Sequence, residues 1–287
     1  MHHGRMENAA LISRLERVDA LNAVALARAL STQDRSWGTL TLAVAGGHLV
    51  LCGPGLYVNR AIATGIAEPL QATDIDLVVD RSAAMGVRPE IEVTPVTHTE
   101  SRAVLSAYGF GPDADAGTSV HVYPLDRLAS HLSRPGIRVV RVSERSLEEW
   151  QAVSAAGWGH DTEDARRAAD AFSRAAHTVD GDGMIIALDE DDGRPLGCAS
   201  LTIHDDVATL GGMSTLPAER GRGVQAALIL HRLGIARDAG CTLALTTTAV
   251  GEASERNVQR FGFSTTHIKQ TYSWQGRKFD QTAAGVS

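Results

Sequence analysis

Two arginines alternate with two glycines just before an apolar run, in the stretch Arg220-Gly221-Arg222-Gly223. Pro217 stops the strand before this stretch, and the run after it is typical of a helix that ends at Gly240. The first amides of a helix lack internal partners and carry the positive end of its dipole. The glycines leave room for a phosphate, and the arginines donate charge-assisted hydrogen bonds. The loop is therefore predicted to bind a phosphate or pyrophosphate.

The phosphate-bearing ligand is not fixed by the loop alone. No Gly-Lys-Ser/Thr follows it, which excludes the Walker A pattern. Gly221-x-Gly223-x-x-Ala226 matches the dinucleotide fingerprint, but the next strand, LALTTTA, ends without the acid that would hold the ribose. A nicotinamide-dependent oxidoreductase and a merely solvated basic turn both stay open at this point.

Hydrophobic periodicity places the loop within a series of strands and helices. In the C-terminal half we expect strands at 137–143, 183–191, 195–205, 207–216, 241–249 and 263–274, and helices at 146–159, 161–178, 224–240 and 254–261. In the N-terminal half we expect helices at 7–31, 74–86 and 98–110, a hairpin around Gly46-Gly47, and strands at 89–95 and 118–125. The polar stretch 126–136 ends in Pro-Gly and is typical of a linker.

An internal repeat supports two domains. The segments ESRAVLSAYGF and ASERNVQRFGF align at an offset of 153, which places Ser101 on Ser254 and Phe110 on Phe263. The order of strand, helix, Gly-Phe and strand is the same around both segments. We therefore expect one domain at 1–133 and a second at 137–287.

Arg220-Gly221-Arg222-Gly223-Val224 resembles the Arg/Gln-x-x-Gly-x-Gly/Ala signature of the GNAT N-acetyltransferase superfamily. The resemblance covers roughly residues 137–275. It implies an α/β (α+β) fold of two tandem GNAT-like domains, each a central mixed, mostly antiparallel sheet flanked by helices. It also implies a transferase that binds acetyl-CoA as co-substrate and moves the acetyl group directly to an amine.

The resemblance assigns cofactor contacts to particular positions. The pyrophosphate of acetyl-CoA is expected on the loop amides, and the pantetheine arm on the backbone of Met213 to Thr215. Ser254 and Asn257 resemble further family positions that contact the cofactor. The cofactor-binding residues expected are Met213, Ser214, Thr215, Arg220, Gly221, Arg222, Gly223, Val224, Gln225, Ser254 and Asn257.

Two positions depart from the family pattern. Gln225 replaces the last Gly or Ala of the signature, and Val258 stands where the family often has the tyrosine that protonates the departing thiolate. Tyr272 is the nearest phenol that could supply this acid. A base must also deprotonate the amine, and the candidates are Glu252, Glu255, His204, Asp205 and Asp206. The missing tyrosine keeps open a non-catalytic acyl-CoA-binding, regulatory or interaction protein.

The N-terminal half lacks the loop. At the repeat offset, Glu68-Pro69-Leu70-Gln71 replaces Gly221 to Val224, so an acid and a proline stand where open amides would be needed. We expect a degenerate GNAT-like domain that binds no acetyl-CoA there and shapes or covers the active domain.

Composition restricts the remaining function classes. A net charge of −7 argues against a nucleic-acid partner, and no apolar run is long enough to span a membrane. The scattered cysteines Cys52, Cys198 and Cys241 are typical of reduced, buried thiols and give no metal site. We expect a cytoplasmic monomer or homodimer whose acceptor is a small-molecule or peptide amine.

Overall fold

The structure is a computed structural model that describes residues 2–56, 58–128, 134–160, 162–180 and 183–276. Its chain divides into two compact units. Unit 1 contains residues 1–120, 248–257 and 265–287, and unit 2 contains residues 121–247 and 258–264. The sequence suggested a single division at 134–136. The structure instead draws each unit from both halves of the sequence, because β5 (Phe110–Pro124) and β11 (Ser264–Trp274) each change unit along their length.

Unit 1 has a mixed sheet in which β11 lies between β4 and β5. Its strands follow the order β1-β2-β3-β4-β11-β5. The strand bounds are β1 Leu40–Val44, β2 Gly47–Leu51, β3 Arg60–Ile62 and β4 Glu90–Val93. β3 and β4 run parallel through one pair, Ala61 with Ile91, whereas β1 with β2, β2 with β3, and β4 with β11 are antiparallel. The C-terminal half of the sequence thus completes the sheet of unit 1.

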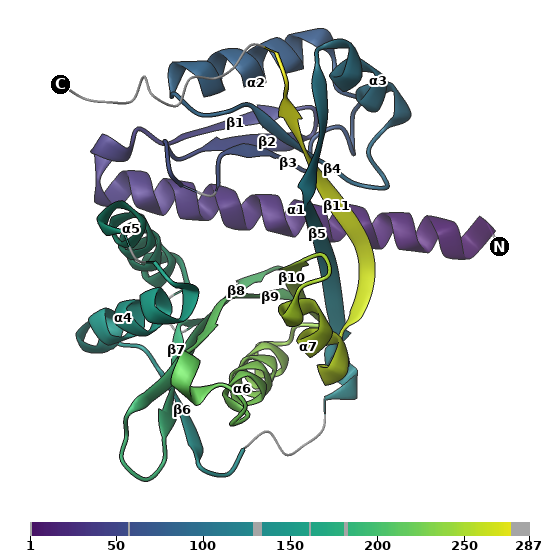
Figure 1. Cartoon of the computed structure of the whole chain (residues 1–287). Coiled ribbons are helices and arrows are strands. Elements are labelled where there is room, and N and C mark those ends of the chain that lie inside the picture. Colours follow the sequence, from purple (N-terminus) through teal and green to yellow (C-terminus); the bar gives the residue numbers. More distant parts are fainter. Residues whose placement is uncertain (1, 57, 129–133, 161, 181–182, 277–287) are drawn as a thin grey trace. The chain divides into compact units, whose positions relative to one another are not determined.

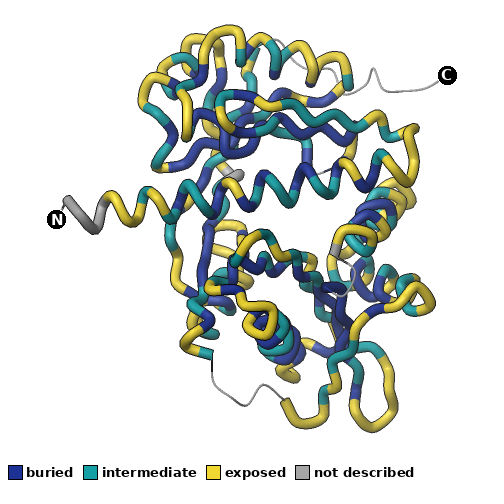
Figure 2. Tube along the Cα trace, turned by 180° about the vertical axis from the view of Figure 1, so that it is seen from behind, coloured by how far each residue is buried: buried dark blue, intermediate teal, exposed yellow. Residues whose placement is uncertain are grey.

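Helices cover both faces of this sheet (Figure 1). They are α1 (His2–Gln33), α2 (Ala72–Ala84) and α3 (Thr99–Ala107). Ile75 and Val78 of α2 and Leu105 of α3 pack into one apolar core with Leu49 and Ile91 of the strands. α1 covers the opposite face and buries Leu15 and Val18 completely. Figure 2 shows that buried residues follow the strands of this unit and that exposed residues collect on its turns.

A cluster of buried charged side chains lies between α1 and the sheet of unit 1. Lys269 of β11 places its Nζ 2.5 Å from Asp19, 2.9 Å from Glu92 and 3.6 Å from Glu16. Glu16 also lies 2.9 Å from Nε2 of His267. Burial alone lowers the pKa of Lys269, but the carboxylates of Asp19, Glu92 and Glu16 outweigh it and raise that pKa. Lys269 thus shares one positive charge among these three acids, and Arg60 adds a second at 2.9 Å from Glu92.

Unit 2 has a sheet with the strand order β10-β9-β8-β7-β6. The strand bounds are β6 Ile137–Arg141, β7 Ile185–Asp189, β8 Pro195–His204, β9 Val207–Thr215 and β10 Leu243–Ala249. The pairs from β6 to β9 are antiparallel, and β9 with β10 is parallel. A parallel pair needs a crossover connection, which here is the loop after β9 followed by α6.

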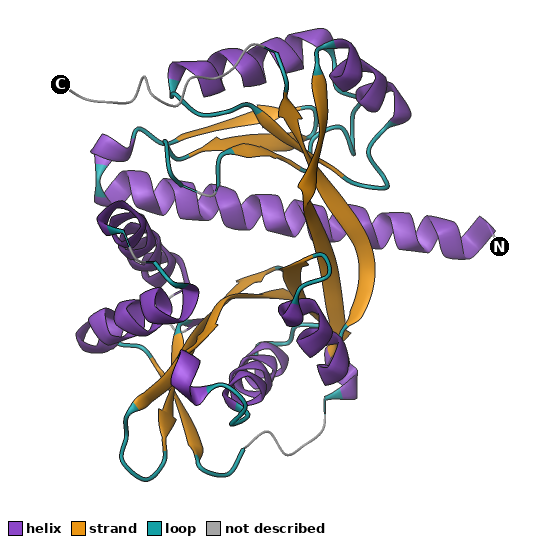
Figure 3. Ribbon diagram, viewed as in Figure 1, coloured by secondary structure: helices purple, strands orange, loops and turns teal. Residues whose placement is uncertain are grey.

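The helices of unit 2 are split between the two faces of its sheet (Figure 3). Their bounds are α4 Leu147–Trp158, α5 Glu163–Asp180 and α6 Val224–Asp238. A further helix, α7 (Ala253–Phe261), follows β10 and has residues in both units. Trp150 and Val153 of α4 pack with Ile186 and Cys198 on one face. Val224 and Leu228 of α6 pack with Ile185, Ala187 and Ala199 on the other.

The α/β fold class and the repeat predicted from the sequence both agree with the structure. α2 and α6 start 152 residues apart, and α3 and α7 start 154 residues apart, close to the predicted offset of 153. Two details differ from expectation. β3 was not predicted, and β5 begins at Phe110 rather than near 118. Residue 161 and the segments 129–133 and 181–182, on which parts of the expected linker and helix fall, lie outside the described residues.

A candidate acyl-CoA site

The loop after β9 is an open backbone turn ahead of α6. Gly221 and Gly223 have φ angles of +82° and +86°, a region that side chains rarely adopt. A Cβ added at either glycine would meet no atom within 4 Å. Gly223 is the N-cap of α6 and gives the helix no side-chain cap. The glycines therefore leave the space beside the loop free of side chains, which an anion at the start of α6 would require.

The two loop arginines have different roles in the structure. Arg222 pairs with Asp189 at 2.9 Å and with Glu219 at 2.5 Å. Arg194, from the turn before β8, pairs with the same two acids. Arg220 instead donates to the carbonyl of Gly157 at 3.4 Å. Sequence reasoning assigned Arg222 to a phosphate but missed Asp189 and Glu219, which hold its side chain against the start of the loop.

These ion pairs make a pH-dependent contribution to stability. The hydrogen bond from Arg222 is the main cause that lowers the pKa of Asp189, and the one from Arg194 is the main cause for Glu219. A carboxylate with a lowered folded pKa stabilises the fold fully above its unfolded value, about 3.9 for Asp and 4.3 for Glu. This contribution is lost as pH falls through the lowered folded pKa.

We expect the double variant Asp189→Asn, Glu219→Gln to unfold at a lower temperature than wild type at pH 7. Its unfolding temperature should decline less than that of wild type between about pH 5 and pH 3, since two of the titrating groups are gone. Thermal unfolding at pH 3, 5 and 7 measures both quantities. Parallel declines in the two proteins would show that these pairs do not couple to folding.

β9 is distorted where the resemblance places the pantetheine arm. The register with β8 shifts between Cys198 and Ser200, because Cys198 pairs with Ser214 whereas Ser200 pairs with Gly211. β9 therefore carries an extra residue, a β-bulge, at Gly212-Met213, and Gly212 has φ +55°. On its other side, β9 pairs with β10 at Val207, Ala208 and Thr209, and the ladder ends there. The backbone of β9 beyond Leu210 thus has no ladder with β10, and both strands are fully described in this region.

Ser214 and Thr215 are held in place from the α4 side. Ser214 is buried, and its Oγ lies 3.5 Å from the carbonyl of Val153. A Cβ added at Gly157 of α4 would lie 1.7 Å from that Oγ, so only glycine allows α4 to pack this closely. The side chain of Ser214 faces α4, and its contribution to a ligand would come from the backbone.

A buried arginine lies beneath the bulge. Arg232 of α6 is 1% exposed, and its Nη1 donates to the carbonyls of Ser200 at 3.0 Å and Gly211 at 3.1 Å. Its Nη2 lies 3.1 Å from the sulfur of Met213. Sequence reasoning did not single out Arg232. The sequence feature that could have indicated it is an arginine in the middle of a mostly apolar helix.

The other sequence-predicted site residues fall in different places. Val224, which is buried, and Gln225 begin α6 directly after the loop. Ser254 and Asn257 lie on the part of α7 that belongs to unit 1. The loop, Met213, Ser214 and Thr215 are together in unit 2.

The candidate acids and bases lie in unit 1 and at the β8–β9 hairpin of unit 2. Tyr272 pairs in register with Ile91 of β4 and packs against the core of unit 1. Glu252 is exposed in the turn before α7, and Glu255 accepts hydrogen bonds from Ser119 and the amide of Gly251, all within unit 1. The remaining candidates, His204, Asp205 and Asp206, lie at the β8–β9 hairpin, the opposite end of β9 from Thr215.

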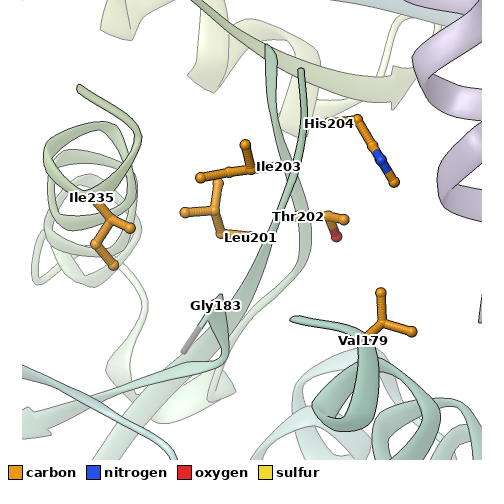
Figure 4. Close-up of a pocket in the computed structure, with 7 residues that line it drawn as sticks. All are labelled: Val179, Gly183, Leu201, Thr202, Ile203, His204 and Ile235. Carbon is orange, nitrogen blue, oxygen red and sulfur yellow. The ribbon is translucent and has the colours of Figure 1, made fainter. Parts of the chain in front are cut away.

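A pocket of about 300 Å³ also lies at this hairpin end of β8 (Figure 4). Successive side chains of β8 point alternately toward α5 and α6 around it. Its lining residues are Val179, Gly183, Leu201, Thr202, Ile203, His204 and Ile235. Gly197, at the loop end of β8, pairs with Thr215, so the pocket is separate from the loop.

The buried cysteines and the buried tryptophan Trp150 have structural roles. Burial raises the pKa of Cys52 and of Cys198 to about 12, which keeps these thiols protonated and unreactive at neutral pH. Trp150 is buried and donates from Nε1 to the carbonyls of Ile185 and Ala199. Trp150 is therefore a core residue of unit 2.

The matching loop of unit 1 is closed by its own side chains. The carboxylate of Asp74, in the first turn of α2, accepts the amide of Gln71 at 2.8 Å. The amide of Leu70 is bonded to Ser101 Oγ at 2.9 Å. An anion at this position would meet an acid that is already seated on the helix start.

Among the described residues, the one group of acids close enough to share an ion is Glu16, Asp19 and Glu92, and Lys269 lies within ion-pair distance of all three. Among the described residues, no helix has both the length and the hydropathy that crossing a membrane requires.

Comparison with known proteins supports the fold. The model of the Acetyltransferase (GNAT) family matches residues 144–263. A search of curated proteins finds no match to the sequence.

Solved structures resemble the chain at low identity. A GCN5-related N-acetyltransferase from Kribbella flavida is 18% identical with a TM-score of 0.57, over 87% of this chain and 95% of its own. A tandem GNAT protein from the clavulanic acid biosynthesis pathway is 16% identical with a TM-score of 0.58, over 79% and 77%. A GNAT-family acetyltransferase from Colwellia psychrerythraea is 13% identical with a TM-score of 0.54, over 83% and 85%. These likenesses concern the fold alone.

Proposed function

We propose, from the GNAT-family domain that residues 144–263 carry, that this protein transfers an acetyl group from acetyl-CoA directly to an amine. The loop Arg220–Gly223 and the start of α6 would hold the pyrophosphate. The backbone of Met213 to Thr215 would hold the pantetheine arm as an added strand, and the roles of Ser254 and Asn257 stay predictions.

The observation that carries this proposal is the combination of an open loop and a strand, β9, whose ladder with β10 ends before the loop. Cβ positions at Gly221 and Gly223 are free of neighbours, and the helix start has no side-chain cap. Directly before them, β9 bulges and leaves its ladder with β10. One site therefore offers amides to an anion and a free strand backbone to an extended chain, which together fit an acyl-CoA better than a dinucleotide.

In the proposed reaction, the backbone stabilises charge and water or the amine supplies the proton. The amine nitrogen attacks the thioester carbon, the C–N bond forms, the C–S bond breaks, and the thiolate leaves with a proton. Backbone donors near Met213 would stabilise the negative charge that develops on the carbonyl oxygen. Val258, which is buried in the core of unit 2, supplies no phenol to protonate the thiolate. We therefore assign that proton to water or to the amine itself, with Tyr272 and Glu252 kept as candidates.

The test is thiol release from acetyl-CoA by the full chain over a panel of amines. The panel contains peptides with free N-termini, lysine peptides, polyamines, aminoglycosides and amino acids. Release that requires one class of amine, with acetylation of that amine confirmed by mass spectrometry, supports the proposal. Silence across the panel, with acetyl-CoA bound, favours the second candidate.

The second candidate is a non-catalytic acyl-CoA-binding or regulatory protein, and the buried Val258 at the tyrosine position favours it. Neither candidate gives the loop of unit 1 a ligand, since Asp74 and Ser101 occupy its amides. We assign unit 1 a structural role.

A further inference from the structure

Arg232 is buried in α6, and its hydrogen bonds are all with other residues of unit 2. Its guanidinium reaches three backbone carbonyls, those of Leu228, Ser200 and Gly211, and the sulfur of Met213. Among the described residues, no carboxylate lies within ion-pair distance of it. Burial lowers its pKa to about 9, and the group still carries its charge at neutral pH.

A buried cation without an anion generally reduces stability compared with an apolar residue of similar size. Leu228 and Leu233, neighbours of Arg232 on α6, are fully buried and apolar. A methionine at 232 would pack in the same environment with no charge to desolvate. The position of the charge therefore needs another explanation.

The contacts of Arg232 are concentrated at the β9 bulge. Ser200 and Gly211 form the first regular pair on one side of the register shift, and Met213 lies within the bulge itself. One Nη1 bonds to both members of that pair. The rigid fork of the guanidinium thus fixes the distance and direction at which the bulge leaves the sheet.

The bulge leads into the backbone to which the proposed function assigns the thioester. A fixed positive charge in a water-poor environment stabilises negative charge that develops on an adjacent carbonyl oxygen, without reorganising during the reaction. This argument rests on the proposed function.

We propose that Arg232 is a positioning residue for the acyl thioester: it holds the β9 bulge in place and supplies a positive charge beneath Met213. It does not touch the acceptor amine, and it acts through the backbone of β9.

The test is difference infrared spectroscopy of carbonyl-¹³C acetyl-CoA bound to wild type, Arg232→Met and Arg232→Lys. Polarisation of the thioester lowers its carbonyl frequency. We expect a lowered frequency in wild type and the loss of at least about half of that shift in Arg232→Met. The dissociation constant for CoA should change less than about threefold, because the loop is intact. Arg232→Lys keeps the charge without the fork and should restore part of the shift.

Arg237→Met is the matched control, because Arg237 is an exposed arginine of the same helix that pairs with Asp238. It should leave the frequency unchanged. If Arg232→Met binds CoA and keeps the wild-type frequency, the inference is wrong while the proposed function stands. If wild type binds no acetyl-CoA, both fail.

Gly212→Ala is a second route should the arginine variants fold poorly. It keeps Arg232 and strains the bulge directly, since φ is +55° and its Cβ would lie 2.9 Å from Ser200 Oγ. The same loss of shift is expected. An unchanged frequency in this variant would overturn the inference.

Discussion

Gly223→Asp is expected to weaken acetyl-CoA binding at least about 100-fold, equivalent to about 2.7 kcal/mol or more. The residue has φ +86°, so any side chain strains the loop by about 1–2 kcal/mol. An aspartate there also places a carboxylate at the start of α6, where the phosphates would have to bind. Strain and repulsion act in the same direction. Isothermal titration of acetyl-CoA into wild type and variant measures the effect.

Gly240→Asp is the control for strain alone. Gly240 follows the other end of α6, has φ +82° and has no neighbour within 4 Å of an added Cβ. Gly240→Asp should lose more stability than Gly223→Asp, because a carboxylate is unfavourable at the C-terminal end of a helix and favourable at its N-cap. Only Gly223→Asp should lose the ligand. Equal affinity in the two variants would mean that the loop does not bind the pyrophosphate.

Lys269→Met is expected to lower the free energy of unfolding of unit 1 by about 3–5 kcal/mol. The lysine is 3% exposed and lies within ion-pair distance of Asp19, Glu92 and Glu16, all of unit 1. Its removal leaves buried carboxylates without that cation. Urea unfolding, with hydrogen exchange of β4 and β11 peptides, reports the loss in unit 1 separately.

Arg88→Met serves as the matched change at the surface of unit 1. Arg88 pairs with Asp113 at 3.4 Å and is 41% exposed, so its loss should cost less than about 1 kcal/mol. A loss below about 1 kcal/mol for Lys269→Met as well would show that the buried cluster adds no net stability. Protonation of Asp19, Glu92 or Glu16 in the variant would then account for the small loss of stability.

The elements around the loop could be predicted because their signals are local. Pro217, the alternating glycines and the apolar run fix where β9 ends and α6 begins. The repeat needed only two similar segments at a constant offset, and the helix starts follow it closely. The α/β class and the GNAT likeness rest on these same local patterns.

The remaining features depend on contacts between residues far apart in the sequence. No local pattern indicates that Lys269 neutralises Asp19, or that β11 pairs with β4, because each joins residues more than 170 positions apart. β3 has three residues, too few for an alternation to be recognised. The pairing of Arg222 with Asp189 likewise depends on how two turns meet.

The catalytic candidates were the least predictable part. Tyr272 and Glu252 were chosen by residue type and position in sequence, and the structure puts Tyr272 against the core of unit 1. An acid or base needs a defined geometry to the reacting atoms, which sequence spacing does not supply. Their roles stay predictions.

The most direct test of the central claim is the stoichiometry of acetyl-CoA binding to the wild-type full chain, by isothermal titration, with NAD and NADP titrated in parallel. The account predicts one acetyl-CoA per chain, at the Arg220–Gly223 loop, and no micromolar binding of either dinucleotide. No acetyl-CoA binding, or tight binding of NAD or NADP instead, would contradict it.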